Sequence, residues 1–256
     1  IAMLKGGLED ETELTDRIAR HFDTCLGCMA CVTACPSGVQ YDKLLAAARP
    51  QVERRLDRPI ADRLFRRLIF GLFPYPRRLR VVSLALWAYQ KLGVQRLARS
   101  TGLLNLLPSR LRAMEALMPS ISLRRAWTET PRLAPAVGER RRRVGLLLGC
   151  VQRVFFDEVN AATIRVLTAE GCDVIIPASQ GCCGALMFHA GMEDDAVVAA
   201  RRFIDVFESE ASDVDTIVIN AAGCGSTLKE YGHLLRDDPR YAERARLLSA
   251  KCKDIS

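Results

Sequence analysis

The chain has 256 residues, of which 49% are hydrophobic and 26% charged, so it can bury a core and is not a largely disordered protein. Its net charge is +7, and the positive charge is concentrated in residues 49–143, which hold 22 Arg or Lys and six Asp or Glu. Such a basic block favours contact with an acidic partner, an anionic membrane surface or nucleic acid. No stretch approaches the ~18 uncharged apolar residues of a transmembrane helix, so we expect none.

The ten cysteines are unevenly placed along the chain. Four fall within eleven residues, and two are adjacent, at positions 182 and 183. Tight C-x-x-C spacing in a chain of this length favours a metal site over a disulfide framework and indicates a reducing compartment, so we predict a cytoplasmic protein. The ends, Ile1 and Ser256, lack the features of natural termini, and we expect the chain to be an internal portion of a longer protein.

Residues 1–48 form the first predicted domain, which carries the group of four cysteines and a helical pattern over 42–48. Residues 49–143 predict a basic helical region, because leucines recur there at spacings of three and four residues with Arg between them. Prolines 59, 74, 76, 108 and 119 mark the expected helix breaks. Residues 128–143 are rich in Pro, Gly and Arg and predict a linker.

From Val144 onward the pattern changes to alternating strands and helices. Strands are predicted over 144–149, 173–177 and 216–220, and helices over 157–170, 194–210 and around 227–235. This alternation predicts βαβ units and a parallel sheet within residues 144–256. We therefore expect an α+β protein overall, in which a helical cysteine-containing domain and a helical region precede an α/β domain.

The first group of cysteines has the spacing C-x2-C-x2-C-x3-C-P of bacterial ferredoxins, in Cys25, Cys28, Cys31, Cys35 and Pro36. In such a tight loop closely spaced thiolates can bind the irons of one cubane, so we predict a 4Fe-4S cluster. A zinc knuckle and merely packed cysteines are the alternatives. In two-cluster ferredoxins the fourth cysteine binds the other cluster, so Cys35 either completes this cluster or serves a partner motif upstream of Ile1.

The second group of cysteines follows the predicted strands, with a glycine beside each site: Cys150, Cys182, Cys183 and Cys224. Ligands of open parallel sheets bind outside the carboxyl ends of the strands. We therefore expect these four thiols to converge on one metal or redox site, which iron or zinc could occupy. Buried structural cysteines are the alternative, and we expect that role for Cys172 and Cys252.

The residues around the second group resemble a known domain. Gly-Cys150, Cys182-Cys183-Gly and Ala-Gly-Cys224-Gly are similar to the cysteine-rich CCG domain of heterodisulfide reductase-like proteins. Together with the ferredoxin spacing and Cys-Pro-Ser-Gly-Val-Gln-Tyr at 35–41, the chain resembles the iron–sulfur subunits of glycolate oxidase (glycolate dehydrogenase). In that family two ferredoxin motifs precede two CCG domains, which implies that this chain carries the second motif and the first CCG domain.

The chain departs from the fuller CCG pattern at Thr227, where that pattern has a further cysteine. The resemblance therefore leaves open which group the second site holds. It could be the unusual cluster of heterodisulfide reductases, a regular cubane or zinc.

The resemblance implies an oxidoreductase component, an iron–sulfur electron-transfer subunit of a flavin-dependent 2-hydroxy-acid dehydrogenase that acts on glycolate. A flavin-containing dehydrogenase subunit would be its partner, since the chain has no G-x-G-x-x-G motif, and electrons would pass to a quinone or another acceptor. Lactate-utilisation and anaerobic glycerol-3-phosphate dehydrogenase subunits are similar as well. The same cysteines would also suit a catalytic subunit that reduces a disulfide or heterodisulfide, or a zinc-stabilised module that binds nucleic acid.

The basic helical region and one histidine complete the predictions. We favour docking of the basic region on an acidic subunit, ahead of peripheral contact with the inner face of the cell membrane, and nucleic-acid binding is the least favoured of the three. His189 follows the adjacent cysteines and is either a donor to a cluster sulfur or a turn cap.

Overall fold

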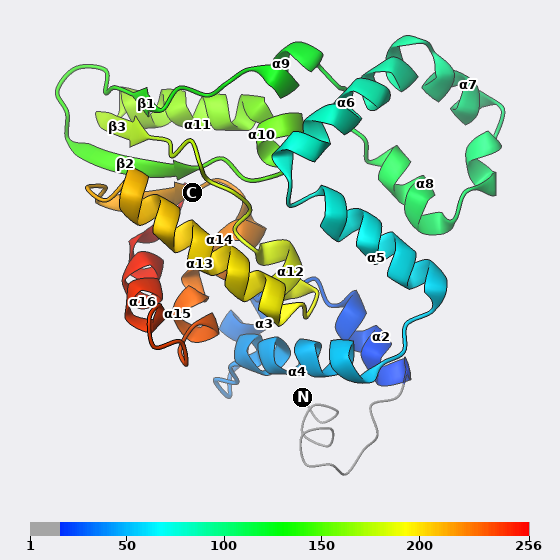
Figure 1. Ribbon diagram of the computed structural model, residues 1–256, viewed down its shortest axis with the longest axis horizontal. Coiled ribbons are helices and arrows are strands. Elements are labelled where there is room, and N and C mark those ends of the chain that lie inside the picture. The colour runs from blue at the N-terminus through cyan, green and yellow to red at the C-terminus, as the bar shows by residue number, and fades with distance from the viewer. Residues whose placement is uncertain (1–15, 256) are drawn as a thin grey trace.

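The computed structural model describes residues 16–255, and Figure 1 shows the chain passing from N-terminal helices through an arm of helices into a domain built on a sheet. The N-terminal part contains α2 (Asp16–Thr24), α3 (Ala30–Thr33) and α4 (Tyr41–Arg55). Phe22 of α2 shares a buried core with Leu45 and Val52, which lie seven residues apart on one face of α4. Burial of this face explains why α4 continues through Pro50 to Arg55, beyond the predicted 42–48.

Residues 60–127 form the helical arm: α5 (Ile60–Leu72), α6 (Pro76–Lys91), α7 (Val94–Ser100), the 3-10 helix η1 (Leu103–Leu106), α8 (Ser109–Ala116) and α9 (Leu123–Trp127). Three prolines stand at helix starts, as predicted: Pro59 and Pro108 directly precede α5 and α8, and Pro76 opens α6. The arm is fixed to the sheet domain by a small core of Leu79, Ala126 and Val154. None of the helices within residues 16–255 has the length and apolar content that a membrane span requires.

The sheet has the strand order β1-β3-β2-β4-β5. Its strands are β1 (Leu133–Ala134), β2 (Arg142–Leu147), β3 (Cys172–Ile175), β4 (Thr216–Ile219) and β5 (Cys252–Asp254). β2 to β5 pair in parallel, and β1 runs antiparallel to β3 at one edge. The three predicted strands correspond to β2, β3 and β4, so the α/β class with a parallel sheet is confirmed. β1 lies within the segment predicted to be a linker, and β5 was not predicted.

Helices cover both faces of the sheet: α10 (Gln152–Phe155), α11 (Asp157–Ala169), α12 (Ala185–His189), α13 (Glu193–Glu210), α14 (Ala222–Lys229), α15 (Tyr231–Leu234) and α16 (Ala242–Lys251). In β4, Ile217 and Ile219 belong to the core shared with α13 to α16, and Val218 belongs to the core shared with α11. Burial on both faces gives the strands their continuous apolar sequences.

The N-terminal helices pack against the sheet domain at the turn between α12 and α13. Gly191 in this turn has a φ of +79°, and a Cβ on it would lie 2.5 Å from the carbonyl oxygen of Arg49 in α4. Lys43 forms an ion pair with Glu230, and the Arg66 guanidinium donates a hydrogen bond of 3.2 Å to the Ala190 carbonyl. These contacts bring the loop of residues 25–35 toward the loops that follow the strands.

Candidate metal centres

Four thiols meet at the carboxyl ends of three parallel strands, as predicted. Cys150 follows β2, Cys182 and Cys183 follow β3, and Cys224 follows β4. Thiol–thiol hydrogen bonds join Cys150 to Cys182, Cys182 to Cys183 and Cys183 to Cys224. We call these four side chains the sulfur row. Cys224 lies in the first turn of α14, because this helix begins at Ala222 and not near the predicted Thr227.

Backbone N–H groups point at the sulfur row. The Gly184 N–H donates to Cys182 Sγ at 3.4 Å, and the N–H groups of Val151 and Ala185 donate to Cys150 and Cys183. Gly184 has a φ of +80°, and a Cβ there would lie 3.1 Å from the Ala196 carbonyl oxygen of α13. A glycine at this position therefore permits the close approach of the loop to α13, and the N–H bonds favour sulfur in its thiolate form.

Without a metal, three thiols of the row, those of Cys150, Cys182 and Cys183, have raised pKa values and are hard to ionise. The hydrogen bond with Cys182, together with burial, raises the pKa of Cys150. For Cys182, the hydrogen bond from Cys150 lowers the pKa, but the contact with Cys183 and burial outweigh it and raise the pKa to about 12. A metal must therefore displace protons from the row to bind it.

A network of buried amides holds the three loops together. The Gln180 side chain accepts a hydrogen bond from the Leu148 N–H (2.9 Å) and donates to the carbonyls of Leu146 and Pro177. The Gln152 amide donates to Asn160 Oδ1 (3.0 Å) and to Asn220 Oδ1 (2.7 Å). Sequence reasoning missed these residues. The available signal was their position, because Gln152, Gln180 and Asn220 each lie within four residues of a cysteine of the row.

The ferredoxin-type cysteines occupy the loop between α2 and α4. Cys25 borders the core of α2 and α4, Cys28 and Cys31 are exposed, and Cys35 is partly exposed beyond α3. Burial raises the pKa of the Tyr41 hydroxyl, and interactions with Cys25 and Cys31 raise it further. Both thiols therefore lie on the side of the loop that faces α4. The Arg49 guanidinium, which sequence reasoning missed, donates a hydrogen bond to the Cys25 carbonyl.

The donor sets can be tested against the groups predicted for them. Within residues 16–255, no three side chains of Cys, His, Asp or Glu form a group that could hold a single metal ion. A structural zinc ion needs four ligands around one centre, whereas the sulfur row is a chain of contacts. In an iron–sulfur cluster each thiolate binds a different iron. An all-sulfur set that receives N–H bonds suits an iron–sulfur cluster, and the eight cysteines stay a prediction as ligands.

His189 connects the two cysteine loops. Its Nδ1 lies 3.3 Å from the position of a Cβ on Gly27, between Cys25 and Cys28, and its Nε2 lies 3.3 Å from Thr227 Oγ1 in α14. Burial, followed by the charge of Arg49, lowers the pKa of His189, so the ring is neutral near pH 7. Thr227, where the fuller CCG pattern has cysteine, is 1% exposed and occupied by this contact.

Three family models match successive parts of the chain. They are a 4Fe-4S binding domain (residues 18–41), the linker region of the glycolate oxidase iron–sulfur subunit (residues 61–118) and a cysteine-rich domain (residues 144–229). The matches fall on the N-terminal helices, the helical arm and the sheet domain up to the end of α14. The predicted ferredoxin-type and CCG domains, with iron–sulfur cofactors, are thereby confirmed.

Two relatives are similar along the whole chain. The probable glycolate oxidase iron–sulfur subunit of Bacillus subtilis (strain 168) is 38% identical over 257 residues, which cover 100% of this chain and 57% of that protein. The glycolate oxidase iron–sulfur subunit of Escherichia coli (strain K12) is 34% identical over 260 residues, with the same coverage. The chain thus spans 57% of the length of these relatives.

A third relative is similar over a shorter stretch. Lactate utilization protein A of Bacillus licheniformis is 35% identical over 114 residues, 44% of this chain and 46% of that protein. No solved structure matches the chain significantly. From the order of its three matched domains and its whole-chain similarity to these relatives, the chain is an iron–sulfur protein that joins a ferredoxin-type 4Fe-4S domain to a CCG domain through a linker similar to that of glycolate oxidase iron–sulfur subunits.

Proposed function

We propose that this chain is the iron–sulfur electron-transfer part of a flavin-dependent 2-hydroxy-acid dehydrogenase complex that oxidises glycolate. The observation that carries the proposal is the position of His189 between the two cysteine sites: its ring lies beside Gly27 of one loop and contacts Thr227 beside the other. Two redox groups held this closely suit a relay better than two independent structural metals. The substrate follows from the whole-chain similarity to glycolate oxidase iron–sulfur subunits.

The eight predicted ligands would hold two groups, with Cys25, Cys28, Cys31 and Cys35 at a 4Fe-4S cluster and the sulfur row at a second cluster. Bound clusters supply reversible one-electron transfer, with potentials set by hydrogen bonds to sulfur, charge and solvent exposure. The N–H groups of Val151, Gly184 and Ala185 would stabilise the thiolates of the row. Arg153, whose charge acts on Cys150 and Cys182, would offset their negative charge.

The proposed partners are a flavin-containing dehydrogenase subunit, which supplies electrons, and a quinone or another acceptor. We place the complex in the cytoplasm, with peripheral contact on the inner face of the cell membrane as the alternative site of action.

The first experiment measures iron, acid-labile sulfide and zinc in anaerobically purified protein, together with electron paramagnetic resonance after reduction. We expect iron and sulfide in near-equal amounts and a reducible signal. Cys28→Ala should lower the iron and sulfide contents, because the first cluster loses a ligand while the second is retained, whereas the matched control Cys172→Ala, in β3 outside both sites, should keep the wild-type contents. Zinc without sulfide would contradict the relay and support a zinc-stabilised scaffold.

The second experiment tests the substrate in the assembled complex. Glycolate added anaerobically with the flavin-containing subunit should reduce the clusters of this chain, as measured by bleaching of their visible absorption. The 114-residue similarity to lactate utilization protein A makes lactate the second candidate. Faster reduction by lactate than by glycolate would favour it, and turnover of a disulfide by this chain alone would favour the catalytic alternative.

A further inference from the structure

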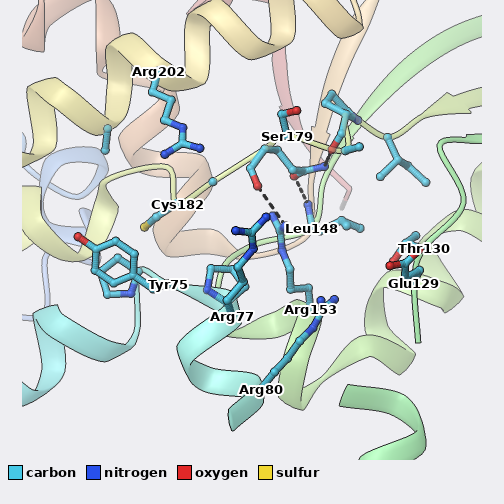
Figure 2. Close-up of a pocket in the computed structure, with 18 of the residues that line it drawn as sticks. Tyr75, Arg77, Arg80, Glu129, Thr130, Leu148, Arg153, Ser179, Cys182 and Arg202 are labelled. Carbon is cyan, nitrogen blue, oxygen red and sulfur yellow. Dashed lines mark hydrogen bonds between the residues drawn. The ribbon is translucent and has the colours of Figure 1, made fainter. Parts of the chain in front are cut away.

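A cavity of about 850 Å³ opens beside the sulfur row, at Cys182. Its walls come from the start of α6, the segment between α9 and β1, the loop between β3 and α12, and α13. The volume is within the range of small-molecule sites, roughly 300–1,000 Å³. Figure 2 shows Arg202 pointing into this space from α13, with Arg77, Arg80 and Arg153 extending toward it from the opposite side.

The charge of the lining is strongly unbalanced. Two carboxylates line the cavity, Glu129 and Asp195. Five arginines line it as well: Arg77, Arg80, Arg132, Arg153 and Arg202. Among residues 16–255, none of these five guanidinium groups lies within 4.0 Å of a carboxylate. Burial is the main cause that lowers the pKa of Arg153 to about 10, and the nearby charge of Arg80 contributes to this lowering. Because positive charges outnumber negative ones around the cavity, the local potential is positive and attracts anions.

Arg153 is held so that part of its guanidinium lacks an acceptor. Its Nε donates to the Gly149 carbonyl at 2.8 Å and its Nη1 to the Gln180 carbonyl at 3.0 Å, which fixes the plane of the group. Its Nη2 is buried and has no hydrogen-bond partner among the described residues. An unsatisfied buried donor is energetically unfavourable, so this atom favours an acceptor from outside the chain.

The negative charge of the sulfur row itself does not account for the whole set. Arg153 interacts with Cys150 and Cys182 and can offset their charge. Arg77, Arg132 and Arg202 are exposed side chains from α6, the segment before β1 and α13. They flank the open side of the cavity with Thr130 and Ser179, whose hydroxyls can donate hydrogen bonds.

We propose that this cavity binds a small organic oxyanion, with its carboxylate or phosphate group held by Arg77, Arg153 and Arg202. Guanidinium groups recognise both oxyanions through paired N–H donors. The apolar side chains of Phe70 and Met187 also line the cavity and would contact the rest of the molecule. The bound ligand lies beside Cys182, at the exposed side of the proposed second cluster, while its binding requires only the folded cavity.

The test is isothermal titration of the cluster-loaded protein with citrate and with phenyl phosphate, at constant ionic strength because salt screens such contacts. We expect saturable binding of one of the two, which identifies the oxyanion class, and no heat from glycerol as a neutral control. Arg77→Gln and Arg202→Gln should each weaken binding about tenfold, since each removes charge-assisted hydrogen bonds. Arg165→Gln, an exposed arginine of α11 outside the cavity, should leave it unchanged.

Absence of saturable binding by both anions would overturn the proposal, as would equal weakening in Arg165→Gln. If titration of the assembled complex shows no binding, and Arg77→Gln weakens assembly, an acidic segment of the partner subunit occupies the cavity instead. Iron and sulfide contents of Arg77→Gln and Arg202→Gln should match the wild type. Failure here is therefore distinguishable from failure of the proposed electron-transfer role, which appears in the metal analysis.

Discussion

At the scale of single residues, buried amides determine how firmly the cysteine loops are held. Gln180 is 4% exposed and bridges the Leu148 N–H and the carbonyls of Leu146 and Pro177. Gln180→Leu would leave these backbone groups buried without partners, so we expect a loss of about 2–4 kcal/mol in the free energy of unfolding. Urea denaturation measures it. Gln51→Leu, in α4 and without a hydrogen bond to another described residue, is the matched control and should change stability by less than about 1 kcal/mol.

A second residue-scale prediction concerns the contact between the two halves of the chain. Gly191 and Gly93 both have positive φ, +79° and +73°, but a Cβ on Gly191 would lie 2.5 Å from the Arg49 carbonyl, and one on Gly93 would meet nothing within 4 Å. Gly93→Ala should therefore lose about 1–2 kcal/mol of stability through its backbone conformation alone. Gly191→Ala should lose about 1–3 kcal/mol more, because α4 must move away. Equal losses in the two variants would show that α4 does not press on this turn.

Residue spacing predicted the two cysteine groups but not the charges around them. The spacing of Cys25 to Cys35 is itself a chemical pattern, and the cysteines of the row follow strands that the apolar runs indicate, so both groups could be read from the sequence. The roles of Arg49 and Arg153 could not be read from the sequence, because these are two arginines among many. Their role depends on burial and on distances that arise only when distant segments pack.

At the scale of elements, length decided what could be predicted. The long helices α11 and α13 and the strands β2, β3 and β4 have enough periodicity or apolar content to be recognised. β1 has two residues and β5 has three, which is too short for any alternation to appear. Both strands form because β3 and β4 offer them open edges, and an edge is a property of the assembled sheet.

The helical arm is stabilised by a carboxylate that joins two of its helices. Glu115 of α8 accepts hydrogen bonds from Gln95 (2.9 Å) and Arg99 (3.0 Å), both of α7. Burial alone would raise the pKa of Glu115, but these hydrogen bonds outweigh it and lower the pKa below the ordinary value of 4.5. Since the pKa is depressed in the folded state, the stabilisation is present above 4.5 and is lost as the pH falls through the folded pKa.

Glu115→Gln should therefore destabilise the chain by about 1–2 kcal/mol at neutral pH, a value kept small because Arg99 is half exposed. The difference in stability between this variant and the wild type should shrink as the pH falls below 4.5 and through the folded pKa, because the wild-type carboxylate then becomes neutral too. Chemical denaturation of both proteins at neutral pH and at a pH below 4.5 measures both effects. Glu158→Gln, in an exposed pair with Arg125, should change stability little at either pH. A difference independent of pH would mean that the Glu115 charge does not contribute.

At the scale of the whole molecule, most of the positive charge lies on segments other than those that carry the cysteines, although Arg77 and Arg80 reach the cavity beside Cys182. Figure 1 shows the helical arm extending from α5 to α8 away from the sheet. The arm lies within residues 49–143, where the 22 basic residues far outnumber the six acidic ones. The sequence alone predicted this charge and its helical setting. It could not show that the arm leaves its basic side chains exposed while the sheet domain encloses the sulfur row.

This separation predicts a partner that docks on the arm through charge. Arg67 of α5 and Arg96 of α7 are exposed and form no ion pair with another described residue. The double variant Arg67→Gln and Arg96→Gln should weaken association with the proposed flavin-containing subunit about tenfold and reduce its dependence on salt, because exposed interfacial charges act mainly through long-range attraction. Surface plasmon resonance at two salt concentrations measures both effects, and Arg165→Gln in α11 should match the wild type. If the double variant instead keeps its affinity for the subunit and loses binding to vesicles containing phosphatidylserine, the arm contacts the membrane surface and the subunit docks elsewhere.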